Sequence, residues 1–184
     1  SARALADEGA SVAISYVASP DKAEALVRDL RAKGIQAQAF KADQADPKAV
    51  DQLVKDVAQH FGRIDILVNN AGVAVTGAID DPNSDIAAFD RQYAINVDGV
   101  IAAIRSASQL MGDGGRIVTI GSDIATRASF PGMADYAATK AAIVGYTKGA
   151  ARDLGPRGIT VNVVAPGFID TDMNPKDGPG AEAQ

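Results

Sequence analysis

The chain has 184 residues, 47% of them hydrophobic and 22% charged, which is the balance of a globular domain and excludes a long disordered chain. It contains no cysteine and one histidine, so disulfides and thiolate chemistry are excluded and a zinc site is disfavoured. The net charge of -5 argues against a nucleic-acid partner, and no apolar run approaches the roughly 20 residues that span a bilayer. We therefore expect a cytoplasmic protein with no metal, no nucleic-acid partner and no membrane attachment.

Strand-like and helix-like segments alternate along the chain. Short apolar runs predict strands at 11–16, 36–42, 64–69, 116–121 and 159–165. Helical periodicity predicts helices at 1–8, 21–33, 46–61, 86–110 and 135–154, with Gly9, Gly34 and Gly62 ending the first three. This alternation predicts a single α/β domain over residues 1–184. Its fold would be Rossmann-type and doubly wound, with a mainly parallel sheet between helices on both faces, in three α/β/α layers.

In such a sheet ligands bind beyond the carboxyl ends of the strands, where several chemically distinctive residues fall. Tyr136 and Lys140 lie four residues apart and so share one helical face. A neighbouring ammonium lowers the pKa of a phenol, which could then exchange a proton with a carbonyl or an alcohol. Ser122 follows a strand and could bind the same oxygen, and Asn96 lies inside an apolar helix that does not favour it. Each pattern alone is also typical of a helix surface, a cap or a satisfied buried amide.

Small or polar residues also follow the other predicted strands, and they are Asp43, Asn70, Ala71, Gly72, Pro166, Gly167, Ile169 and Thr171. A carboxylate at position 43 could accept a hydrogen bond from an adenine amino group. Small residues at positions 71 and 72 would let the backbone approach a flat ligand closely. Ordinary turns and a solvated loop acid explain the same residues as simply.

In chain order these motifs resemble the short-chain dehydrogenase/reductase family. The matching segments are 4–10, the Asn-Asn-Ala-Gly run at 69–72, Asn96, Ser122, Tyr136-x-x-x-Lys140 and 166–171. The resemblance implies hydride transfer between a nicotinamide cofactor and a carbonyl or alcohol. Residues 116–172 most resemble the 3-oxoacyl-[acyl-carrier-protein] reductases of fatty acid biosynthesis and related ketoreductases. A small molecule or an acyl thioester is therefore the expected substrate.

The resemblance also implies a role for each matching residue. Tyr136 would be the general acid/base, Lys140 would lower its pKa and bind the nicotinamide ribose, and Ser122 would orient the substrate oxygen. Asn96 would complete a proton relay through water. The implied cofactor contacts are Asp43 and Gln44 at the adenine, Asn70, Ala71 and Gly72 along the adenosine, Tyr136 and Lys140 at the ribose, and Pro166, Gly167, Ile169 and Thr171 at the nicotinamide.

Cofactor preference and assembly follow from the same resemblance. In the family an acidic residue after the second strand favours NAD(H), whereas here no acid follows the strand at 11–16 until Asp21. This absence favours NADP(H) over NAD(H). The helices that carry Asn96 and Tyr136 resemble the family's dimer-forming pair, so we expect a homo-oligomer, either a dimer or a homotetramer.

The sequence departs from the family pattern at both ends. It lacks the first strand with its glycine-rich, phosphate-binding turn, and it lacks the C-terminal substrate helices and last strand. We expect the chain to be part of a longer protein and the neighbours of the central strand to be left unpaired. The alternative is a non-catalytic scaffold or oligomerisation module. A serine hydrolase is disfavoured, because there is no G-x-S-x-G run and His60 lies at a predicted helix end.

Overall fold

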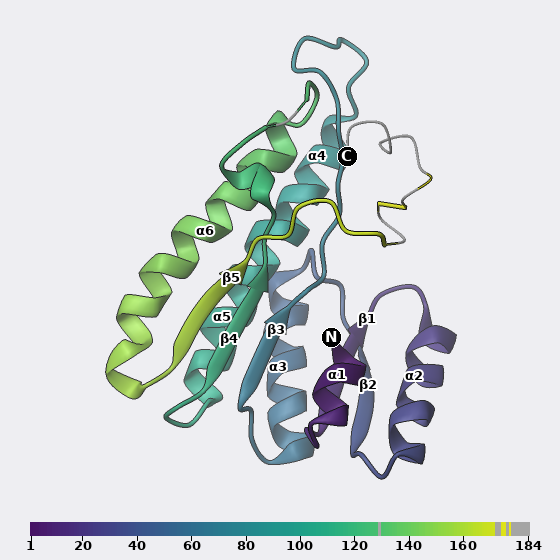
Figure 1. Cartoon of the computed structure of the whole chain (residues 1–184), viewed down its shortest axis with the longest axis vertical. Helices are drawn as coiled ribbons and strands as arrows, with labels where there is room; N and C mark the ends of the chain where they lie inside the picture. The colour runs from purple at the N-terminus through teal and green to yellow at the C-terminus, as the bar shows by residue number, and fades with distance from the viewer. Residues whose placement is uncertain (129, 172–173, 176, 178–184) are drawn as a thin grey trace.

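A computed structural model describes residues 1–128, 130–171, 174–175 and 177, and these form an alternating α/β fold (Figure 1). The strands are β1 (Val12–Tyr16), β2 (Ala37–Lys41), β3 (Ile66–Asn69), β4 (Arg116–Ile120) and β5 (Thr160–Val164). The α-helices are α1 (Ala2–Asp7), α2 (Pro20–Ala32), α3 (Pro47–Phe61), α4 (Ile86–Tyr93), α5 (Gly99–Leu110) and α6 (Ala134–Leu154). Short 3-10 turns, η2 (Asp123–Ala125) and η3 (Gly155–Arg157), follow β4 and α6. Every predicted strand and helix is present.

The glycine stops have the backbone geometry that their prediction requires. Gly9, Gly34 and Gly62 have φ angles of 85°, 81° and 77°, in the left-handed region that suits glycine after a helix. At the start of α3 the carboxylate of Asp46 accepts a hydrogen bond of 2.9 Å from the backbone N–H of Lys48, with Pro47 at the first helical position. Local sequence therefore fixes where these helices begin and end.

The predicted helix over 86–110 differs from the expectation in its middle. The π-helical turn η1 (Ala94–Asp98) separates α4 from α5, and it buries Ile95, Asn96 and Val97. A π-turn inserts an extra residue into a helix and is frequently found at functional sites. Apolar periodicity over 86–110 does not reveal this insertion, so the sequence predicted an uninterrupted helix.

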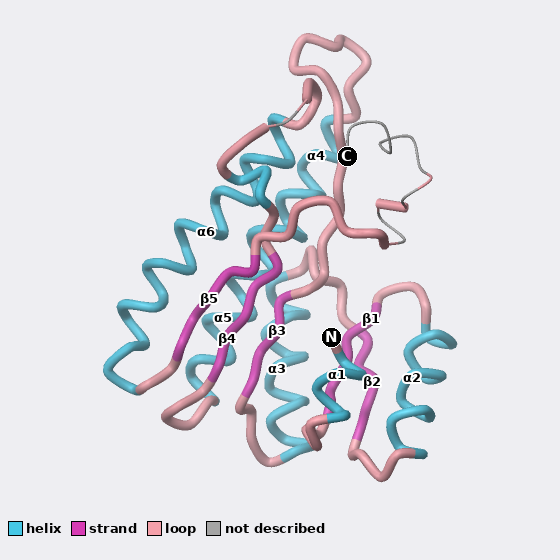
Figure 2. Tube along the Cα trace, viewed as in Figure 1, coloured by secondary structure: helices cyan, strands magenta, loops and turns pink. Residues whose placement is uncertain are grey.

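The parallel strands form two separate groups, β1–β2 and β3–β4–β5 (Figure 2). Among the described residues, no strand pairing joins β1 to β3. A cleft of about 710 Å³ lies between them, lined by residues of both strands and by side chains of α1, α3 and α5. β1 and β3 are therefore unpaired along this side, and a central strand between them stays a prediction.

Helices cover both sides of the strands, as the doubly wound fold requires. Helices α3, α5 and α6 pack against β4 and β5 around Ile104, Ile117 and Ile143, which are at most 2% exposed. A second core joins α1 and α2 to β1 and β2 around Val27 and Leu30. In Figure 1, α3 and α5 lie behind β3 and β4, whereas α1 lies in front. Within the described residues, no helix combines the length and apolarity that crossing a membrane requires.

Candidate active site

The residues predicted to carry the chemistry meet beyond the carboxyl ends of β4 and β5. Ser122 follows β4, Tyr136 and Lys140 lie in the first two turns of α6, and Asn96 lies in η1, which packs on α6. Parallel pairing of β4 with β5 aligns their carboxyl ends, so the loops that follow lie side by side. Gly121 at this crossing donates a hydrogen bond of 2.7 Å to the carbonyl oxygen of Val164. The fold therefore brings together four residues from three segments of the chain.

Lys140 is the anchored cation of the site. Its side chain is buried, and Nζ donates a hydrogen bond of 3.1 Å to the carbonyl oxygen of Ile120 at the end of β4. Nζ also lies 5.5 Å from the centroid of the Tyr136 ring, as the i, i+4 spacing on α6 predicts. One protein acceptor leaves further ammonium N–H groups for a ligand, because an ammonium has three donors.

The pKa of Tyr136 is governed by burial and by two neighbouring side chains. Burial raises it above its ordinary value, the Ser122 hydroxyl lowers it, and the negative charge of Asp123 raises it further. Burial lowers the pKa of Lys140. Loss of solvent around the phenolate thus dominates the pKa of Tyr136, and a lowering contribution of Lys140 stays a prediction.

Asn96 holds the loop that follows β3. Its Oδ1 accepts a hydrogen bond of 3.0 Å from the N–H of Val73, and its Nδ2 donates to the Val73 carbonyl at 2.9 Å and to Thr139 Oγ1 at 3.2 Å. Both amide hydrogens thus have protein partners. The observed role of the side chain is to join this loop to α6; the implied water relay stays a prediction.

Two further side chains brace the same region, and the sequence reading missed both. Thr139, 1% exposed, donates from Oγ1 to the carbonyl of Tyr136 at 2.8 Å. Gln92, one turn before Asn96, accepts a hydrogen bond of 2.5 Å from the N–H of Val75. A polar residue inside an apolar helix was the available signal, and it identified only Asn96.

Ser122 has both the capping role and the site position that its sequence allowed. Its Oγ accepts a hydrogen bond of 3.4 Å from the N–H of Ile124 at the start of η2. The same hydroxyl donates to Oδ1 of Asp123 at 3.3 Å. The serine is half-buried, and its place at a substrate oxygen stays a prediction.

Asp43 and Gln44, predicted at the adenine, lie after β2 beside α4 and α5. The Asp43 carboxylate accepts hydrogen bonds from the N–H of Ala45 at 2.9 Å and from Nη2 of Arg91 at 3.1 and 3.2 Å. The Ala45 N–H and Arg91 hold the pKa of this carboxyl below its usual value. Gln44 packs on Gly99, where an added Cβ would lie 2.1 Å from the Gln44 carbonyl oxygen. Arg91, unnoticed in the sequence, thus places a cation at this end.

The small residues after β3 and β5 also reach the predicted region. A Cβ on Gly72 would lie 3.3 Å from Asn96 Oδ1 and 3.7 Å from Lys140 Nζ, so the missing side chain leaves room between these two groups. Asn70 and Ala71 precede it along the same loop and line the cleft between β1 and β3. Pro166 accepts a hydrogen bond of 3.0 Å from the N–H of Asp123, which places Pro166 and Gly167 beside Ser122.

Ile169 and Thr171 lie farther along the segment after β5. The Ile169 side chain is 56% exposed. Thr171 exchanges backbone hydrogen bonds of 3.2 and 3.0 Å with Asn174. No contact of the described residues joins either of them to Tyr136, so their place at a nicotinamide stays a prediction.

The donor set fits the ribose end of a nicotinamide cofactor. Lys140 offers ammonium N–H groups, and Gly72 offers a backbone surface without a side chain beside it. Tyr136 adds a phenol on the same face of α6. Polyhydroxyl groups suit such donors, and a flat ligand suits the glycine.

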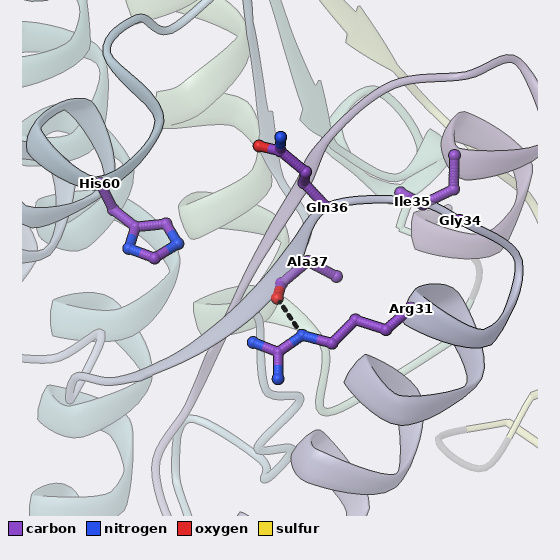
Figure 3. Close-up of a pocket in the computed structure, with 6 residues that line it drawn as sticks. All are labelled: Arg31, Gly34, Ile35, Gln36, Ala37 and His60. Atoms are coloured by element: carbon purple, nitrogen blue, oxygen red, sulfur yellow. Dashed lines mark hydrogen bonds between the residues drawn. The ribbon is translucent and has the colours of Figure 1, made fainter.

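A second hollow, of about 360 Å³, lies at the amino end of β2 and holds none of the predicted residues (Figure 3). Arg31 donates from Nε to the Ala37 carbonyl at 2.9 Å across it. His60, in the last turn of α3, packs edge-on against Phe40 and Phe61 with centroid distances of 6.0 and 4.6 Å. Because this hollow is at the amino ends of the strands, it is separate from the site.

Comparison with known proteins identifies a family and several similar proteins. The sequence matches the short chain dehydrogenase family over residues 1–181. It is 42% identical to the 3-oxoacyl-[acyl-carrier-protein] reductase FabG of Staphylococcus aureus strain Mu50, over 92% of this chain and 68% of that protein. It is 43% identical to the cyclic-di-GMP-binding biofilm dispersal mediator protein of Escherichia coli K12, over 96% and 70%. A short chain dehydrogenase from Burkholderia cenocepacia J2315, solved with NADP, superposes with a TM-score of 0.95 at 52% identity, over 99% of this chain and 74% of that one.

Proposed function

This chain belongs to the short-chain dehydrogenase family and is an NAD(P)-dependent oxidoreductase, and from that premise we propose that it reduces a 3-oxoacyl thioester or a similar ketone with NADPH. The observation that carries the proposal is the cluster of Ser122, Tyr136 and buried Lys140 at the carboxyl ends of β4 and β5. The similarity to a 3-oxoacyl-[acyl-carrier-protein] reductase supports this substrate class.

The preference for NADP(H) is supported by two observations. No acidic residue follows β1 before Asp21, and such an acid would repel a 2′-phosphate. A related structure from Burkholderia cenocepacia was solved with NADP. Titration of the protein with NADPH and NADH, followed by cofactor fluorescence, tests this preference, and tighter binding of NADH would contradict it.

In the proposed reaction, NADPH when bound supplies the hydride to the carbonyl carbon. Tyr136 is protonated at neutral pH, because burial keeps its pKa above the ordinary value, and it is the group that gives a proton to the carbonyl oxygen. Ser122 orients the same oxygen by donating from Oγ. Lys140, held on the Ile120 carbonyl, binds the ribose hydroxyls and adds a positive charge beside the reacting oxygen.

The decisive experiment measures NADPH oxidation with methyl acetoacetate or a 3-oxobutanoyl thioester. We expect Tyr136→Phe to lower kcat/KM by roughly 10² to 10⁴, the usual contribution of a general acid. Tyr146→Phe, a half-buried tyrosine on the same helix, is the matched control and should keep its activity. Unchanged activity in Tyr136→Phe would reject the mechanism. Failure of the wild type to bind NADPH would favour the scaffold alternative.

Assembly and location extend the proposal. We propose a homodimer or homotetramer formed through α5 and α6. The solvent-facing side of α6 includes Ala138, Ala141 and Gly145, which would allow a second helix to approach closely. A cytoplasmic location accords with an enzyme that uses NADPH. Light scattering after size-exclusion chromatography measures the assembly, and a monomer at micromolar concentration would contradict it.

A further inference from the structure

Asp123 is a charged residue at the site for which the proposed reaction has no use. It follows Ser122 and opens η2. Its N–H donates to the Pro166 carbonyl at 3.0 Å, so the loop after β4 is tied to the loop after β5. Its Oδ2 lies 3.5 Å from the point that a Cβ on Gly167 would occupy, and its Oδ1 accepts the Ser122 hydroxyl hydrogen bond at 3.3 Å. The carboxylate is therefore fixed between the serine and the turn after β5.

The carboxylate of Asp123 has no cationic partner in the part of the chain that the structure describes. Its electric field reaches the phenol of Tyr136. Burial is the main cause of the raised pKa of Tyr136, and the negative charge of Asp123 raises this pKa further. An unpaired carboxylate near the reacting oxygen repels any further negative charge that arrives there.

Two aromatic side chains near Asp123, Phe130 and Phe168, also disfavour an anion. Phe168, directly after Gly167, stacks with Phe130 at a centroid distance of 6.3 Å and an interplanar angle of 23°. The two rings come from the segments after β5 and after β4, and Phe168 directly follows Gly167, which lies beside the Asp123 carboxylate. Removing a carboxylate or phosphate from water beside such rings is costly unless a cation pairs with it.

We propose that Asp123 is a specificity-determining residue. It excludes carbonyl substrates that carry a carboxylate or phosphate near the reducible carbonyl. It admits substrates that are uncharged there or that offer a hydrogen-bond donor. This inference rests on the proposed reductase function and narrows its substrate class. A neutral ester or thioester of a 3-oxo acid fits the site, whereas the free 3-oxo acid is repelled. Selection by repulsion of the wrong substrate is a general route to specificity.

The test uses methyl acetoacetate and acetoacetate, which share a 3-oxo group and differ in charge. The wild type should prefer the ester, and Asp123→Asn should shift the ester-to-acid ratio of kcat/KM toward the acid by about tenfold, the effect of one partly screened charge a few ångströms away. Asp113→Asn removes an equal charge at the opposite end of β4, from a residue whose side chain is 82% exposed, and should leave the ratio unchanged. An unshifted ratio in Asp123→Asn overturns the inference.

A binding measurement separates this inference from the proposed function. Both compounds are titrated calorimetrically into wild type and Asp123→Asn without cofactor, so that charge preference is read without turnover. If neither compound is reduced but the binding ratio shifts toward the acid in the variant, the reductase proposal fails and the role of Asp123 stands. If both compounds are reduced, and Asp123→Asn changes the ester-to-acid ratio neither of kcat/KM nor of binding, the reductase proposal stands and the role of Asp123 fails.

Discussion

The ammonium of Lys140 donates to the carbonyl oxygen of Ile120 at 3.1 Å, so the end of β4 holds the cation in place. Such anchoring removes part of the entropy cost of ordering a long side chain when a ligand binds. It also explains how a buried lysine keeps one hydrogen-bond partner inside the protein.

Lys140→Met should therefore weaken NADPH binding and lower kcat/KM by at least about 100-fold, because the ribose and the developing charge both lose an ammonium. Fluorescence titration and steady-state kinetics measure the two effects. Lys148→Met, an exposed residue two turns along α6, is the control and should change neither. Wild-type affinity and rate in Lys140→Met would show that the anchored cation takes no part in the reaction.

The same variant makes a prediction about pH and stability. Burial lowers the folded-state pKa of Lys140 below 10.5, so the unfolded chain binds more protons in the range between the two values. The free energy of unfolding of the wild type, minus that of Lys140→Met, should therefore rise with pH across this range and level off above it. Urea denaturation at several pH values measures this difference. A difference that falls with pH would mean that pairing, not burial, governs this lysine.

Gly99→Ala should destabilise the fold, because the new Cβ would lie 2.1 Å from the backbone oxygen of Gln44. We expect a loss of about 1–3 kcal/mol as the loop after β2 is pushed away from α5. Gly149→Ala offers the matched control: it lies inside α6, its Cβ meets no atom within 4 Å, and it should stabilise by up to about 1 kcal/mol. Equal effects in the two variants would contradict close packing at Gly99.

Asn96→Ala should lower the free energy of unfolding, because it leaves the N–H and the carbonyl of Val73 without their partner. Unsatisfied buried groups cost about 1–3 kcal/mol each, so chemical denaturation should detect a loss of that order. Asn83→Ala, in an exposed loop, is the comparison and should change stability by less than about 0.5 kcal/mol. An unchanged free energy of unfolding in Asn96→Ala would mean that water replaces the hydrogen bonds of the side chain at no cost in stability.

Local patterns predicted most of the architecture, because alternating apolar runs and glycine stops act over a few residues. The i, i+4 spacing likewise predicted that Tyr136 and Lys140 share a face, which the structure confirms. The rise of the Tyr136 pKa on burial could not be predicted from local patterns, because burial depends on residues distant in the sequence. The Asp43–Arg91 ion pair joins residues 48 positions apart, so no short sequence pattern predicts it. That a central strand belongs between β1 and β3 stays a prediction, although the cleft there is consistent with it.

The π-turn between α4 and α5 has a consequence for how this site can change through evolution. An α-helix advances by about 100° per residue, so one extra residue rotates everything before it relative to everything after it. Removing one residue of Ala94–Asp98 other than Asn96 would turn the face of α4 that carries Gln92 away from the loop at Val75, although every site residue would still be encoded. The site thus depends on the number of residues in this helix as well as on their identity, and a single-codon deletion there should be as damaging as loss of the tyrosine.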